Sequence, residues 1–113
     1  MMRLRSDIFV AAYLRQRNGE NAFAVVRHKG AAEAGAIFIC IDRLDSTADL
    51  YGPAPQTAFD EARPHRLFQK LSPDKATSVE IDARLVREIK FDPDCWIIDV
   101  EDRTGQARLD LVA

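Results

Sequence analysis

The fold is decided by the stretch Ala36-Ile37-Phe38-Ile39-Cys40-Ile41-Asp42. Side chains alternate between the two faces of an extended strand, so the isoleucines share one face while Phe38 and Cys40 share the other. Both faces are therefore apolar, and β-branched residues favour the extended conformation. This pattern predicts a strand at the centre of a sheet.

Further strands are predicted on both sides of this stretch in the sequence. Residues 22–28 alternate as a half-buried strand does, and residues 47–51 follow a turn at residues 43–46. The connection at residues 29–35 has the length of a hairpin loop, so we expect these strands to form a three-stranded meander. Residues 52–55 contain two prolines, which lack the amide donor that a central strand needs, so we expect the third strand to end before them.

The second half of the chain predicts further strands after a surface excursion at residues 56–64. Residues 66–71 are expected to form a short fourth strand at the sheet edge. Residues 95–101 alternate as a strand, and a turn at residues 102–105 supplies a glycine for a left-handed position. Alternation at residues 107–111 then predicts that the chain closes with a hairpin.

An amino-terminal helix is predicted from an apolar run at residues 8–14. Ser6 and Asp7 can cap its start, and Gly19 marks its end. No polar stripe interrupts the run, so either the domain covers this helix on two sides or part of it meets another chain. A buried strand is the competing interpretation.

A second helix is predicted from Thr77 onwards, where Thr77 and Glu80 match a capping box. Asp92 and Pro93 close this helix, because the residue before a proline is disfavoured in helical geometry. Its apolar stripe, which we expect to cover one side of the sheet, contains Ile81, Leu85, Val86 and Ile89.

These elements define the predicted fold class, a single α+β domain over residues 1–113. The expected order is α-β-β-β-(β)-α-β-β, with two helices and an antiparallel-rich sheet of about five to six strands.

Composition excludes several classes of protein. The chain has 113 residues and a net charge of -2, from 16 basic and 18 acidic residues, so general nucleic-acid binding is disfavoured. No run approaches the ~20 apolar residues of a membrane span, and the basic start lacks a cleavage site for a signal peptide. Cys40 and Cys95 lie far apart without neighbouring histidines, which indicates no metal site or disulfide framework and a cytoplasmic protein.

One small binding site is a candidate. The loop Gly30-Ala31-Ala32-Glu33-Ala34-Gly35 has the glycine spacing of a phosphate loop but lacks its lysine and its serine or threonine. Arg27, His28 and Lys29 precede this loop and can bind a phosphate or carboxylate, with Glu33 balancing their charge in the empty site. The sequence therefore offers a small anionic ligand as one hypothesis.

Covalent catalysis is not indicated. Cys40 among isoleucines and Cys95 beside Trp96 are expected to be buried thiols of raised pKa. The serines occupy turn or cap positions, and no Gly-x-Ser-x-Gly motif occurs. We therefore expect a protein that is not an enzyme and carries no metal or cofactor.

The favoured hypothesis is a non-catalytic interaction module that acts as a homodimer. So small a domain cannot enclose every helix, which leaves the apolar first helix as a candidate interface. The interface residues predicted on it are Ile8, Phe9 and Tyr13.

Three stretches, at residues 5–15, 27–38 and 48–54, together with the Asp92-Pro93-Asp94-x-Trp96 approach to the last hairpin, carry a resemblance to a known family. The chain resembles, over nearly its whole length, the short alphaproteobacterial proteins of domain of unknown function 1491. The resemblance implies a self-contained bacterial domain of this length. It implies no activity and no catalytic residues.

Overall fold

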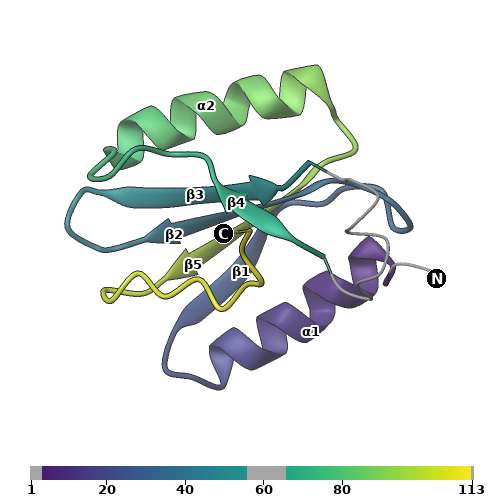
Figure 1. Cartoon of the computed structure of the whole chain (residues 1–113), viewed down its shortest axis with the longest axis horizontal. Helices are drawn as coiled ribbons and strands as arrows, with labels where there is room; N and C mark the ends of the chain where they lie inside the picture. Colours follow the sequence, from purple (N-terminus) through teal and green to yellow (C-terminus); the bar gives the residue numbers. More distant parts are fainter. Residues whose placement is uncertain (1–3, 56–65, 113) are drawn as a thin grey trace.

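The structure, a computed structural model, describes residues 4–55 and 66–112. It is an α+β domain with a mixed, mostly antiparallel sheet between two helices, which confirms the predicted fold class (Figure 1). The excursion predicted at residues 56–64 lies outside the described residues. The elements are α1 (Ser6–Asn18), β1 (Phe23–His28), β2 (Ile37–Asp42), β3 (Ala48–Pro53), β4 (Phe68–Lys70), α2 (Ser78–Phe91) and β5 (Trp96–Glu101).

Strand β2 lies at the centre of the sheet, as its sequence predicts. The strand order is β1-β5-β2-β3-β4. β2 pairs in parallel with β5 and antiparallel with β3, and its first five residues are buried. Two apolar faces require cover on both sides, and only an interior strand receives it.

The predicted meander of the first three strands is wrong, because β5 lies between β1 and β2. β5 is apolar on both faces, with Ile97, Ile98 and Val100 completely buried, whereas most residues of β1 are exposed. The more apolar strand therefore takes the interior position. The segment after β1 is consequently not a hairpin loop, and it passes the start of β5 instead. There the Ala31 amide donates to the Asp94 carbonyl at 2.9 Å, and the Trp96 indole donates to the Ala31 carbonyl at 2.8 Å.

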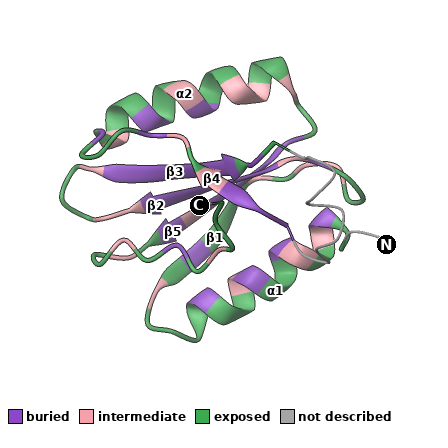
Figure 2. Ribbon diagram, in the orientation of Figure 1, coloured by how far each residue is buried: buried purple, intermediate pink, exposed green. Residues whose placement is uncertain are grey.

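Both faces of the sheet carry a core, one under each helix (Figures 1 and 2). Of the two alternatives for the first helix, one side of α1 packs into the domain's own core, while its other side stays exposed. The core on the α1 face includes Val10, Tyr13, Ile39, Phe68, Trp96 and Ile98. The core on the α2 face includes Phe38, Cys40, Leu50, Ile81, Leu85 and Ile97.

The helix ends were predicted with mixed success. The Thr77–Glu80 capping box of α2 is confirmed, but Val86 on the predicted apolar stripe is 56% exposed. The predicted cap at the start of α1 is wrong, since Arg5 occupies the cap position and its side chain makes no capping hydrogen bond. Ser6 is instead buried, and its hydroxyl donates to the Gly35 carbonyl at 2.7 Å.

The two edges of the sheet differ. β3 continues to Pro53 because it pairs there only with the short β4. The expected closing strand at residues 107–111 is wrong: after the turn at Gly105 this segment is irregular and folds back to β4. There the Phe68 amide donates to the Asp110 carbonyl (2.8 Å) and the Val112 amide donates to the Phe68 carbonyl (3.0 Å). The β4 edge is therefore covered by the chain's own end.

The end of α1 is tied to the turn after β5 by a buried ion pair. Arg17 is 1% exposed, and its Nη2 lies 2.5 Å from Asp102 Oδ2. Among the described residues, Nε and Nη1 of Arg17 have no hydrogen-bond partner, and Glu20 lies 3.7 Å away. A hydrogen bond from the Thr104 hydroxyl, with a further contribution from Arg17, holds the pKa of Asp102 below its usual value.

Candidate functional site

The guanidinium of Arg27, the central residue of the predicted anion site, is occupied by carboxylates. Its Nε donates to Asp99 Oδ2 at 2.8 Å, and its Nη2 lies 3.0 Å from Asp82 Oδ1. These acids come from β5 and α2, which lie far from Arg27 in the sequence. Two carboxylates around one guanidinium leave no excess positive charge for an anionic ligand.

The other residues of that predicted site do not share the partners of Arg27 among the described residues. His28 Nδ1 lies 2.8 Å from the Cys95 carbonyl oxygen. Lys29 is exposed, and the Glu33 carboxylate lies 3.9 Å from Arg5 rather than beside Arg27. The structure therefore does not gather Arg27, His28, Lys29 and Glu33 around one point.

The glycines of the following loop allow backbone to approach backbone. A Cβ atom on Gly30 would lie 2.6 Å from the Cys95 carbonyl carbon, and one on Gly35 would lie 2.9 Å from the Ala31 carbonyl oxygen. The amides of Ala31 and Gly35 donate to carbonyl groups at 2.9 and 3.3 Å. These donors are already engaged, one with the Asp94 carbonyl before β5 and one within the loop, so they do not cradle a phosphate.

A groove of about 200 Å³ lies on the α2 face, beside β1 and over the final residues of β5. Phe23 and Val25 form an apolar wall, and Cys40 lies in the lining. Burial raises the pKa of the Cys40 thiol to about 12, so this sulfur stays protonated at neutral pH and is a poor nucleophile. The charged residues of the lining are Arg27, Asp42, Asp82, Asp99 and Glu101.

The strand that borders this groove, β1, is an edge strand, and in the part of the chain that the structure describes it pairs only with β5. Phe23, Val25 and Val26 are 58%, 40% and 39% exposed, although they belong to a strand of the sheet. The sequence of β1 contains no proline or lysine, which are the residues that commonly protect a sheet edge. An apolar edge without these residues is a surface on which another strand can pair.

The predicted interface residues on α1 divide between the core and the surface. Tyr13 is buried, and its hydroxyl donates to the Ala107 carbonyl at 2.7 Å. Phe9 is partly buried, with ring centroids 6.1 Å from Tyr13 and 5.6 Å from Phe68. Ile8 is 49% exposed. Of the three, Ile8 presents the most apolar surface to solvent.

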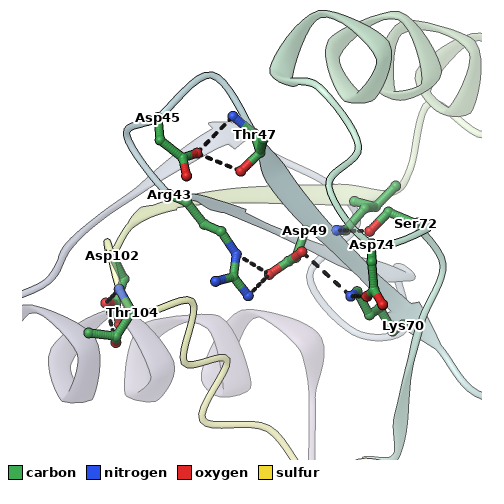
Figure 3. Close-up of polar contacts among 10 residues, drawn as sticks. Arg43, Asp45, Thr47, Asp49, Lys70, Ser72, Asp74, Asp102 and Thr104 are labelled. Carbon is green, nitrogen blue, oxygen red and sulfur yellow. Dashed lines mark hydrogen bonds and ion pairs between the residues drawn. The ribbon is translucent and has the colours of Figure 1, made fainter.

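A polar cluster that was not predicted from the sequence links β3 to β4 (Figure 3). Asp49 is buried, and its carboxylate lies 2.7 Å from Arg43 Nη2 and 3.6 Å from Lys70 Nζ. Lys70 also reaches Asp74 at 2.7 Å. The buried acid is thus neutralised by two cations from neighbouring elements, which gives the cluster a structural role.

Within residues 4–55 and 66–112 no group of three or more His, Cys, Asp or Glu side chains is arranged to hold a metal ion. Across the same residues, no helix has the length and apolar character needed to cross a membrane. The described residues form a small α+β domain in which the edge strand β1 exposes apolar side chains.

The chain belongs to the family described as "Protein of unknown function (DUF1491)", whose model matches residues 4–110. A DUF1491 family protein from Caulobacter crescentus CB15, solved by crystallography, is 31% identical with a TM-score of 0.79, covering 96% of this chain and 99% of that one. The solution structure of protein Atu0922 from A. tumefaciens is 39% identical with a TM-score of 0.82, covering 98% and 96%. No curated protein matches the chain.

Proposed function

We propose that this protein is a non-catalytic interaction module that acts in the cytoplasm as a homodimer, through the side of the domain formed by β1. The observation that carries the proposal is the exposure of Phe23, Val25 and Val26 at an open sheet edge. Removing such side chains from water stabilises an association by about 25 cal/mol per Å² of apolar surface. Two free, buried cysteines, Cys40 and Cys95, fit a reducing compartment.

The contrast between the two sheet edges supports a closed pair of subunits. β4 is hydrogen-bonded to the chain's own end at Asp110 and Val112, whereas β1 has a second side with no strand on it in the described part of the chain. A molecule with two open edges adds copies without limit, while one with a single open edge is satisfied by a second copy. A dimer is therefore the assembly that this arrangement favours.

Helix α1 contributes to the proposed interface through its outer surface. It packs against the α1 face of the sheet beside β1. Tyr13 and most of Phe9 are buried inside the domain. Of the three interface residues predicted on α1, the proposed interface therefore includes Ile8.

An anionic ligand at Arg27, His28 and Lys29 has less support. Asp82 and Asp99 already neutralise Arg27, and an incoming phosphate or carboxylate would have to displace them against their own negative charge. We therefore favour the interaction module.

Val26→Lys tests this proposal. We expect the wild-type chain to sediment near twice its 12.7 kDa mass, and the lysine to weaken the dimer at least about tenfold because it places a charge at the paired edge. Val86→Lys is the matched control, since Val86 is also an exposed valine but lies on α2. A wild-type chain that sediments as a monomer at every concentration, or equal effects of the two lysines, would contradict the proposal.

A further inference from the structure

The side chain of Asn18, the last residue of α1, occupies part of the open β1 edge. Its Nδ2 donates to the Ala24 carbonyl at 3.0 Å, and its Oδ1 accepts from the Ala24 amide at 2.9 Å. A carboxamide carries the same donor and acceptor as a peptide group. Asn18 therefore makes the bonds to Ala24 that a neighbouring strand would make.

These two hydrogen bonds show which backbone N–H and C=O groups in the first part of β1 point towards β5 and which point away from it. In an antiparallel pair, successive residues alternate between bonding the partner strand and pointing away from it. Because the groups of Ala24 point away from β5, those of Val26 also point outward, and those of Val25 face Asp99 on β5. The regular pairing of β1 ends after Val26, where a bulge begins. Ala24 and Val26 are thus the outward-facing residues of this regular segment.

We infer that β1 pairs antiparallel with β1 of a second copy, an inference that rests on the proposed function. The two-fold axis passes through Val25, so that Ala24 lies opposite Val26 of the other copy. Both members of each Ala24–Val26 pair have outward groups, so they can exchange two hydrogen bonds. Val25 then faces its own symmetry mate in a position without hydrogen bonds, where side chains approach most closely. The backbone pattern of β1 is therefore complementary to itself.

The side chains agree with this register. Beyond the regular segment, Phe23 lies near Arg27 of the second copy, and a guanidinium near an aromatic ring is attracted to its face. Arg27 is already held in place by Asp82 and Asp99, so little side-chain freedom is lost on pairing. Centring the pair on Ala24 would instead use Ala22, which lies outside the strand, and centring it on Val26 would require hydrogen bonds between Ala24 and His28 across the bulge.

The two-fold axis also explains how α1 takes part. An axis perpendicular to the sheet keeps each face on its own side, so both α1 helices lie on the same face near the axis. The exposed residues Ile8 and Ala11 are then available for contact between the helices. Asn18 must leave Ala24 when the strands pair, so it competes with the second copy and lowers the affinity of the dimer.

Cysteine cross-linking tests the register. Directly opposite residues in a position without hydrogen bonds have Cα atoms about 4.5 Å apart, within the range of a disulfide. We expect Val25→Cys to give a covalent dimer with oxidised glutathione on non-reducing electrophoresis. Phe23→Cys is the control, because the two copies of this position lie about 13 Å apart along the strands. The native thiols, Cys40 and Cys95, are buried and should not react.

The outcomes separate this inference from the proposed function. A wild-type dimer in which Val25→Cys does not cross-link, or cross-links no better than Phe23→Cys, would overturn the register and leave the homodimer standing. A monomeric wild-type chain would overturn both. As a second measurement, Asn18→Ala should tighten the dimer about tenfold, since it removes the competing hydrogen bonds; an unchanged or weaker dimer would contradict the assigned role of Asn18.

Discussion

Replacing Asp102 with asparagine is expected to lower the free energy of unfolding by about 3 kcal/mol, the low end of the cost of breaking a buried ion pair, because Glu20 remains 3.7 Å from Arg17. Arg17 is 1% exposed, and Asp102 lies closest to its guanidinium. Asparagine keeps the shape of the side chain and an oxygen that can accept from Thr104. The substitution therefore tests the charge of Asp102 separately from its shape and its hydrogen bond. Denaturant unfolding monitored by circular dichroism measures the change in stability.

Asp74→Asn provides the matched control, because the Asp74 side chain is 93% exposed and its ion pair with Lys70 lies in solvent. Such surface pairs contribute about 0–1 kcal/mol. Adding Arg17→Met to the Asp102 variant should recover part of the loss, since the buried charge is then gone. Equal effects of the two asparagine variants, or a double variant less stable than the single one, would show that the Arg17–Asp102 pair does not have this role.

The same pair gives a signed pH dependence. The pKa of Asp102 is lowered in the folded chain, so its contribution is complete above the unfolded value of about 3.9. That contribution is lost as the pH falls through the lower folded value. The difference in stability between wild type and the Asp102 variant should therefore shrink in acid, below about pH 4.

Gly30→Ala is expected to destabilise the fold by about 4 kcal/mol, at the high end of single substitutions. The new Cβ would lie 2.6 Å from the Cys95 carbonyl carbon and 2.7 Å from its oxygen, and still closer to the Asp94 carbonyl. These are backbone atoms at the start of β5, which is held between two strands and cannot yield. Thermal unfolding measures the loss, which should exceed 10 °C for a domain of this size.

Gly19→Ala is the control for this effect, because a Cβ there would meet only Arg15 and Gln16 carbonyl oxygens at 3.4 and 3.5 Å. Alanine also reduces the conformational freedom of the unfolded chain, so a change of less than about 1 kcal/mol is expected. If both alanine variants unfold at the wild-type temperature, the close passage of the loop past β5 is not essential to the fold.

Local patterns in the sequence predicted the elements well. The double-sided apolar pattern of residues 37–41 placed β2 at the centre, and Thr77 with Glu80 located the start of α2. Both signals involve residues within one element, whose geometry follows from backbone periodicity and capping alone. The same holds for the turn at Gly105, which has a positive φ of 71°.

Strand order and the candidate surface were not predictable in the same way. The position of β5 between β1 and β2 depends on a comparison of how apolar β5 and β1 are, not on their proximity in sequence. The partners of Arg27 come from β5 and α2, and Asn18 meets Ala24 only after α1 has packed beside β1. The one local signal was Asn18 itself, a residue common at helix ends, and it did not indicate the strand it contacts.

Hydrogen exchange at the Val26 amide tests most directly whether the β1 edge is the surface through which this protein associates. The amide points away from β5, so in a monomer it is open to solvent, and in the proposed dimer it donates to Ala24 of the second copy. We predict that its protection rises with protein concentration across the dimer's dissociation constant, while the Val25 amide, bonded to β5, stays protected throughout. Rapid exchange of Val26 at all concentrations, in a chain that nevertheless dimerises, would place the interface elsewhere and contradict the account.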